Sequence, residues 1–374
     1  MSALRKLKAM VLGTDDSIQA SNEQLQNAGV PISTADCRSC PDPCDHGNGG
    51  IILLFENLGS DLTFPGHEEY PARWNVDMES QMFGSVKAYR RQVVISTGKS
   101  DWPGVIELVS DSLALPLAAV LLAAPKPPRV EHSNHSNDTV KLPGVFDNES
   151  SSRISVLNGS HHTISDDHDT DTVLVLPDYK VVTEVARTKE GAEQLYRHSL
   201  DPTVTRIGNV FADLTLQSWV LPYACVILLC SHKRRDNRCG IAAVKLEHGL
   251  RVALEHEGWE VHDQVEHPSH HSASLEEFKG SEEEKEEDYL SQLKEAAESK
   301  RALIIRNSHM GGHKFAGNCI IYTPQGASVW YGRVTPHQVE AVVKDTIIGG
   351  KVLPPLLRGG LNLSRPGCSS LNEW

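Results

Sequence analysis

The hydrophobic and polar positions of the chain follow two periods, and their order along the sequence predicts an order of strands and helices. Short apolar runs between polar turns are typical of strands, whereas apolar residues three and four positions apart are typical of helices. In the first half these patterns predict a strand, a helix with a break near Pro116, two strands and a further helix. The five elements are expected at residues 91–97, 102–123, 153–159, 171–179 and 188–200.

The second half repeats this order with clearer signals at the helix ends. A strand, an amphipathic helix, three strands and a final helix are expected at residues 222–230, 240–258, 301–306, 318–323, 328–332 and from 335 onward. Gly258 fits a helix C-cap, while Thr335 and Gln338 fit the two ends of a capping box. Strand, helix, paired strands and helix is the order of a thioredoxin-like layer. The repeat therefore predicts an α/β fold, an α+β sandwich, made of two tandem thioredoxin-like domains.

This order also predicts the domain organisation. Residues 1–31 are expected to form an N-terminal extension, residues 32–203 an N-terminal thioredoxin-like domain with a cysteine cluster, and residues 204–360 a C-terminal thioredoxin-like domain. Residues 262–300 are interpreted as an insertion, with a His- and Ser-rich loop followed by a charged stretch of helical pattern. Residues 361–374 are expected to form a flexible C-terminal tail.

Charge and hydropathy narrow the class of function. The chain has 374 residues and a net charge of -13, and much of this charge lies in local acidic runs such as residues 281–288. This balance argues against binding to nucleic acid. The longest apolar run, residues 113–125, is interrupted by Pro116 and is too short to span a bilayer. We therefore expect neither a nucleic-acid partner nor a membrane.

The cysteine content and the N-terminus bear on the compartment. Eight cysteines are too few for a disulfide scaffold in a chain of this length, and no secretory signal is recognised, so the cysteines are interpreted as thiols or metal ligands. The cytoplasm is the expected location. The basic residues Arg5, Lys6 and Lys8, with no acidic residue among the first 14, leave the mitochondrion as the alternative.

Two cysteines and two histidines of the second half are candidate metal ligands. Cys230 and Cys239 flank the loop "CSHKRRDNRC" between a strand and a helix, and His309 and His313 lie in the glycine-containing loop "SHMGGHKFAGN" between two later strands. Both loops are expected at neighbouring ends of the sheet. Two thiolates and two neutral imidazoles suit either a structural zinc ion or a 2Fe-2S cluster with two histidine ligands. Without a metal, the thiols would be small buried residues and the histidines polar loop residues.

A second candidate site lies near the N-terminus. The segment "CRSCPDPCDHG" supplies Cys37, Cys40, Cys44 and His46 within ten residues. It is interpreted either as a second metal site, which would hold zinc, or as a thioredoxin-like redox pair of Cys37 and Cys40. The remaining interpretation is a group of free thiols with structural turns.

The segments "LLCSHKRRDNRCGIAA" and "SHMGGHKFAGNCIIYTPQGASVWYGRVTP" resemble the sucrase/ferredoxin-like family of thioredoxin-like ferredoxins. Its fungal members include the actin-patches-distal and altered-inheritance-of-mitochondria proteins, and "DCRSCPDPCDHG" is similar to their N-terminal part. The resemblance implies a 2Fe-2S cluster bound by Cys230, Cys239, His309 and His313, with the C-terminal domain as the ferredoxin. It implies no sucrase activity, and the sequence has no paired-carboxylate motif for glycoside hydrolysis.

The function expected from this resemblance is one-electron transfer or redox sensing with a redox partner protein that the sequence does not identify. The chain would be an electron carrier rather than an enzyme. One alternative is a thiol-disulfide oxidoreductase, or redox quality-control protein, that uses the N-terminal cysteine cluster. Another is an adaptor stabilised by zinc.

The C-terminus suggests a further partner. Trp374 follows an acidic residue, and such an ending resembles the C-terminal tripeptide by which clients of the cytosolic iron-sulfur assembly machinery are recognised. That tripeptide prefers an aliphatic residue in third-last place, where this chain has Asn372, with Leu371 one step earlier. The interpretation is recognition of Trp374 by the assembly machinery, against a frayed end with no role.

Overall fold

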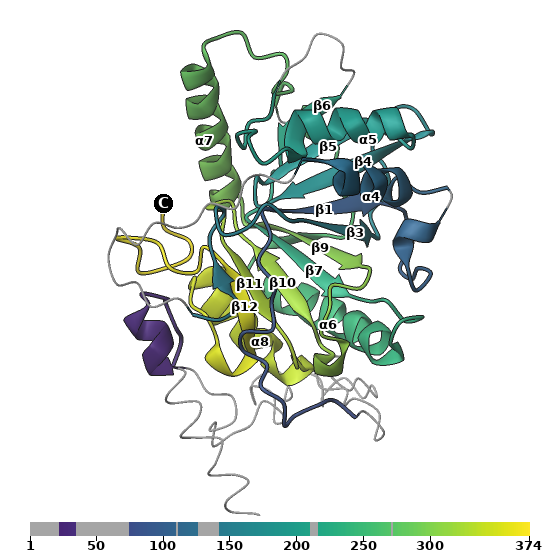
Figure 1. Cartoon of the computed structure of the whole chain (residues 1–374). Coiled ribbons are helices and arrows are strands. Elements are labelled where there is room, and N and C mark those ends of the chain that lie inside the picture. The colour runs from purple at the N-terminus through teal and green to yellow at the C-terminus, as the bar shows by residue number, and fades with distance from the viewer. Residues whose placement is uncertain (1–21, 35–74, 110, 126–141, 210–215, 271) are drawn as a thin grey trace, which may run out of the picture.

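A twelve-stranded mixed sheet runs through the described part of the protein (Figure 1). This computed structural model describes residues 22–34, 75–109, 111–125, 142–209, 216–270 and 272–374. The strands are β1 Arg91–Ser96, β2 Val145–Phe146, β3 Ile154–Gly159, β4 Thr170–Leu176, β5 Lys180–Ala186, β6 Gln217–Val220, β7 Cys225–Cys230, β8 Glu260–His262, β9 Arg301–Asn307, β10 Cys319–Tyr322, β11 Ser328–Tyr331 and β12 Leu357–Leu361. Their order across the sheet is β2-β12-β11-β10-β7-β9-β3-β1-β4-β5-β6, and β8 pairs with β9 outside this path.

The same four-strand arrangement occurs twice in this sheet. In the first half β1 is parallel to β3 and antiparallel to β4, which pairs with β5. In the second half β7 is parallel to β9 and antiparallel to β10, which pairs with β11. The halves meet where β3 and β9 pair antiparallel at Gly159 and Asn307. The Ser308 N–H donates to the Asn158 oxygen (2.8 Å) beside this pair, so one sheet continues across both halves.

The central strands form because their sequences are apolar on both faces. Every residue of β1 and of β7 is buried, as expected for strands covered on both sides. Successive side chains alternate between faces, so Val93 and Val94 enter different cores, as do Ile227 and Leu228. Val94 and Leu228 share one core that extends over both halves, whereas Val93 and Ile227 contribute to two separate cores on the other face.

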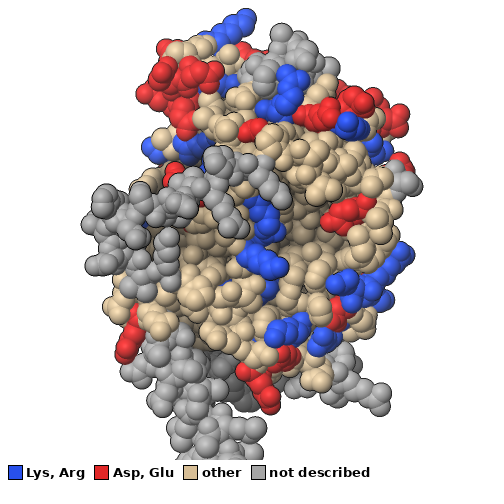
Figure 2. All heavy atoms as spheres, viewed as in Figure 1, with Lys and Arg blue, Asp and Glu red and all other residues tan. Residues whose placement is uncertain are grey.

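Helices cover these two separate cores. The main helices are α4 Ala114–Ala123, α5 Lys189–Leu195, α6 Asn237–His256, α7 Glu282–Glu298 and α8 Val339–Ala341. Helices α4 and α5 lie beside the first-half strands, and α6 and α8 beside the second-half strands (Figure 1). Acidic side chains gather over α7, which stands apart from the other helices (Figure 2). Among the described helices, none is long and apolar enough to cross a membrane.

Several expected elements are confirmed and others are corrected. The predicted capping box of Thr335 and Gln338 is present, and Gly258 ends α6 in the left-handed region with φ 79°. The helix expected at 102–123 begins only at Ala114 and contains Pro116 in its first turn, where a missing N–H costs nothing. The charged part of the predicted insertion forms α7. Strands β2, β5, β6, β8 and β12 were not predicted. The mixed α/β class is confirmed, and the domain boundaries stay a prediction.

The C-terminal segment after β12 packs on the protein instead of forming the expected flexible tail. Leu363 and Leu371 are each 1% exposed and belong to the core beneath α6. The Leu371 N–H donates to the Gly350 oxygen at 2.8 Å, and the Asn372 side-chain amide donates to the Ile347 oxygen at 3.0 Å. Trp374 remains 47% exposed, so the end of the chain is accessible although the segment before it is fixed.

Candidate functional site

The two candidate cysteines lie at the end of one strand and the start of the next helix. Cys230 is the last residue of β7, and Cys239 lies in the first turn of α6, which begins three residues earlier than expected. Asp236 starts this helix, because its side chain accepts the Arg238 N–H at 3.0 Å. Cys230 is 2% exposed and Cys239 1% exposed. Cys239 lies beside the free N–H groups of the helix N-terminus, which carry partial positive charge.

The two candidate histidines follow β9 in a tight loop. Gly311 and Gly312 lie between them with φ 90° and 69°, a left-handed turn that reverses the chain over two residues. His313 then starts a short 3-10 helix that ends at Phe315. The turn places the two imidazoles side by side, with ring centroids 5.4 Å apart.

A third histidine supports this loop and was not predicted. The His309 N–H donates to Nδ1 of His232 at 3.1 Å, and Nε2 of His232 lies 2.8 Å from the Trp102 oxygen. Because Nδ1 accepts a hydrogen bond, the proton of the neutral ring resides on Nε2, which donates to the carbonyl. His232 is 1% exposed. It therefore joins the histidine loop to the segment after β1.

The structure brings three of the four candidate residues into contact. A hydrogen bond from the Cys239 thiol, opposed by burial and assisted by His309 and the Met310 N–H, holds the pKa of Cys230 well below its usual range. The same contact and burial raise the pKa of Cys239. The pair therefore favours one thiolate shared by two sulfurs. His313 approaches this group through its neighbour His309.

The imidazole nitrogens are available as ligands. Nδ1 of His309 and Nδ1 of His313 are buried and have no hydrogen-bond partner. Buried polar atoms are nearly always satisfied, so two such atoms beside a buried thiol pair fit a group that accepts nitrogen and sulfur donors. No three of these four side chains bring ligand atoms within 4.8 Å of one another. These four side chains therefore do not form a closed tetrahedral set of ligand atoms in this structure.

Basic residues occupy the loop between the two candidate cysteines. Lys233, Arg234 and Arg235 are exposed in the loop between the two cysteines. Arg234 pairs with Asp101 (3.4 Å). Arg238 pairs with the N-cap Asp236 at 2.7 Å and acts electrostatically on Cys239. The loop between the thiols is therefore rich in basic residues, although the whole chain is acidic.

The other predicted candidates are not part of this group. Cys37, Cys40, Cys44 and His46 lie outside the described residues. Cys225 and Cys319 are both buried among apolar residues, and burial raises the pKa of each thiol.

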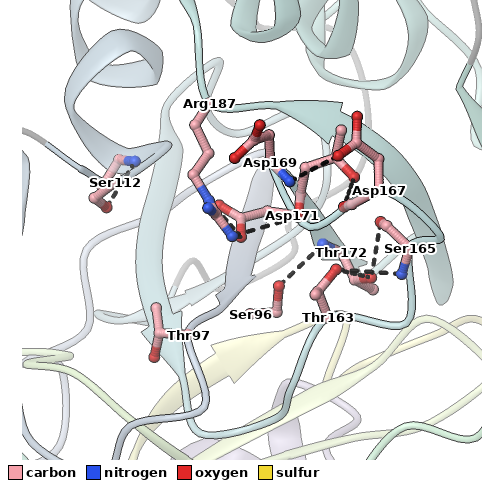
Figure 3. Close-up of polar contacts among 12 residues, drawn as sticks. Ser96, Thr97, Ser112, Thr163, Ser165, Asp167, Asp169, Asp171, Thr172 and Arg187 are labelled. Carbon is pink, nitrogen blue, oxygen red and sulfur yellow. Dashed lines mark hydrogen bonds and ion pairs between the residues drawn. The ribbon is translucent and has the colours of Figure 1, made fainter.

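The corresponding end of the first half carries hydroxyls and carboxylates instead of thiols. Ser96 ends β1 as Cys230 ends β7, and its oxygen accepts the Thr172 N–H at 2.9 Å (Figure 3). Asp171 lies next to Thr172 and pairs with Arg187 at 3.1 Å. Figure 3 shows these side chains pointing toward one another from β1, β4 and the end of β5. This network satisfies itself and offers no sulfur ligand.

One other group could hold an ion by distance alone. Within the described ranges, Glu260, His262 and Glu266 are the three side chains whose ligand atoms all lie within 4.8 Å of one another. Arg301 already forms ion pairs with both carboxylates. The cation of Arg301 thus neutralises this surface group, which presents no open donor set.

Comparisons with known proteins point to one family. The sequence model of the sucrase/ferredoxin-like family matches residues 82–359, a range that includes both candidate cysteines and both candidate histidines. No solved structure matches the chain.

Curated relatives carry the name "Altered inheritance of mitochondria protein 32". The one from Clavispora lusitaniae is 29% identical over 134 residues, which cover 36% of this chain and 34% of the relative. The one from Debaryomyces hansenii is 31% identical over 137 residues, covering 36% and 35%. The one from Saccharomyces cerevisiae strain YJM789 is 36% identical over 75 residues, covering 18% and 23%. The chain therefore spans about a third or less of the length of these relatives.

Proposed function

The chain belongs to the sucrase/ferredoxin-like family, and we propose that it carries single electrons, or senses redox state, through a 2Fe-2S cluster held by two cysteines and two histidines. Cys230 and Cys239 would supply the sulfur ligands, and His309 and His313 the nitrogen ligands. Such a cluster accepts one electron when bound, and imidazole in place of thiolate raises its reduction potential.

The observation that carries this proposal is the pairing of a buried thiol group with two buried, unpartnered imidazole nitrogens. The first thiol of the pair already favours its thiolate form, because Cys239 and His309 donate hydrogen bonds to Cys230. The loop through Gly311 and Gly312 keeps both imidazoles on the same side. These residues exclude water from the ligand atoms, since both cysteines are almost fully buried.

The repeated strand order supports the finer fold proposal of two tandem thioredoxin-like domains, the second being the ferredoxin domain. Both halves have a parallel central pair followed by an antiparallel pair, with a helix after the first strand. The proposed cluster lies where β7 and β9 end. The corresponding end of β1 has Ser96 and no thiol.

The proposed partners are a redox protein of unidentified class and the cytosolic iron-sulfur assembly machinery. Trp374 is 47% exposed, which would allow the assembly machinery to reach it. We propose the cytoplasm as the location. The name of the curated relatives refers to mitochondrial inheritance, so the mitochondrion is the alternative.

Metal analysis and spectroscopy test the proposal. Protein purified without oxygen should contain about two iron and two sulfide ions per chain and show visible absorbance that bleaches on reduction, with a paramagnetic signal. Cys230→Ser should remove the iron. Cys225→Ser is the matched control, since it changes a buried cysteine at the opposite end of the same strand and should retain the iron. Colourless protein that contains only zinc would overturn the proposal.

A further inference from the structure

Arg358 is a buried cation next to the candidate site. It lies on β12, far from both ligand loops in sequence, and is 2% exposed. Within the part of the chain that the structure describes, no carboxylate forms an ion pair with it. Burial lowers the pKa of Arg358 to about 10, and the negative charges of Cys230 and Cys239 act in the opposite direction. A buried guanidinium without a carboxylate is costly unless hydrogen bonds satisfy its N–H groups.

The guanidinium holds the turn between the two histidines. Nη1 of Arg358 donates to the Gly311 oxygen at 3.1 Å and to Oδ1 of Asn318 at 2.7 Å. The amide of Asn318 donates in turn to the Gly312 oxygen at 3.0 Å. The carbonyls of Gly311 and Gly312, between His309 and His313, are therefore fixed by one pair of side chains.

Asn318, the partner of Arg358, also forms a hydrogen bond with Cys230. The backbone oxygen of Asn318 accepts the Cys230 N–H at 3.2 Å. Asn318 thus joins the end of β7 to the histidine turn, and Arg358 orients the Asn318 side chain. The strands and both ligand loops are connected through this one buried contact.

The backbone of β12 is arranged to aim Arg358 at this place. Trp330 pairs with Gly359 and Tyr331 pairs with Leu357, so Arg358 is the extra residue of a β-bulge. Bulges redirect side chains and occur often beside functional sites. The guanidinium also lies 5.7 Å from the Trp330 ring, which restricts its position.

We propose that Arg358 is a positioning residue for the candidate site, which orients the histidine turn toward the thiol pair and stabilises negative charge there. The electron-transfer part of this statement rests on the proposed function. A cation held beside the ligands favours the form with one more electron, so it raises the reduction potential.

Two substitutions separate orientation from charge. Arg358→Gln keeps side-chain N–H donors but removes the charge, whereas Arg358→Lys keeps the charge but loses the planar guanidinium that binds Gly311, Asn318 and Ser85. Arg153→Gln is the control, because Arg153 also donates to two backbone carbonyls, those of Ala88 and Lys87. Two quantities are measured on the full chain. One is the midpoint potential, and the other is the dissociation constant of Co²⁺ for the metal-free protein, determined from the thiolate-to-cobalt absorbance.

Arg358→Gln should weaken Co²⁺ binding at least tenfold and lower the equilibrium constant for one-electron reduction at least tenfold, about 59 mV. Arg358→Lys should weaken Co²⁺ binding similarly but keep the potential near that of the wild type. The proposal is overturned if Arg358→Gln keeps the Co²⁺ dissociation constant and the equilibrium constant for reduction within twofold of the wild type. It is also overturned if Arg153→Gln changes these two constants as much as Arg358→Gln does.

The outcomes also separate this inference from the proposed function. If the wild type contains no iron and sulfide, the electron-transfer function fails, and Co²⁺ binding alone decides whether Arg358 positions the ligands. If Arg358→Gln does not fold, Arg358→Lys decides: weaker Co²⁺ binding at unchanged potential upholds the role, and unchanged binding overturns it.

Discussion

Replacing either glycine of the histidine turn by alanine should reveal where the Arg358 guanidinium lies. Gly311 and Gly312 both have left-handed backbones, so alanine at either position costs about 1–2 kcal/mol. A Cβ at Gly311 would meet nothing within 4 Å. A Cβ at Gly312 would meet the guanidinium, with Cζ of Arg358 at 2.6 Å. The two substitutions thus share the backbone strain and differ in the clash.

The clash should displace the guanidinium from its acceptors. Two hydrogen bonds from a charged donor contribute about 1.5–3 kcal/mol each. Gly312→Ala should therefore lower the free energy of unfolding by about 3 kcal/mol or more beyond Gly311→Ala, and should weaken Co²⁺ binding much more strongly.

Urea titrations of the two variants measure this difference, and a double substitution supplies a further check. In the Arg358→Gln background, Gly312→Ala should cost little more than Gly311→Ala, because the group that it displaces is already gone. Equal losses of stability in the wild-type background, within about 0.5 kcal/mol, would refute the reasoning.

Three further predictions concern other parts of the chain. Burial lowers the pKa of His161 from 6.5 to about 3. Between these values only the unfolded chain takes up the proton, so the free energy of unfolding should fall by about 1.4 kcal/mol per pH unit as pH drops below 6.5. His161→Leu should remove this contribution to the pH dependence. The prediction is contradicted if the wild type and His161→Leu show the same pH dependence of the free energy of unfolding from pH 7 to 5. Burial lowers the pKa of Lys180 from 10.5 to about 8, so its charge at pH 7 costs roughly 3 kcal/mol and stability should rise from pH 8 to 10.5. Lys180→Met should be more stable than the wild type at pH 7 and lose this advantage by pH 10.5; equal urea midpoints at pH 7 would argue against the cost. Deleting Trp374 should leave the melting temperature unchanged and lower the iron content of protein isolated from cells, whereas Leu371→Ala should cost about 2–4 kcal/mol. Full iron content after the deletion would remove the proposed assembly signal.

The central elements could be predicted because their own sequences carry enough information. β1 and β7 are continuous apolar runs, and α6 has buried residues three and four positions apart. The strands that were not predicted depend on tertiary context. β12 contains two glycines and an arginine, and becomes a strand because β11 offers it a hydrogen-bonding edge. The terminal segment was expected to be flexible because most of its residues are polar, and its sequence does not show that Leu363 and Leu371 reach the core.

The candidate ligands could be predicted from residue type and spacing, but the residues that position them could not. Arg358 is 40 residues from Asn318 and meets it only through the pairing of β11 with β12 and a bulge within it. No local pattern indicates such a contact. The first half of the chain leads to the same conclusion about the site residues. β1 and β7 each lie between one parallel and one antiparallel strand, yet Ser96 ends β1 within a closed network of hydroxyls and carboxylates. The strand arrangement alone therefore does not create the site. The candidate site combines a thiol at one strand end, a glycine turn that brings two imidazoles together, and a buried cation hydrogen-bonded to that turn.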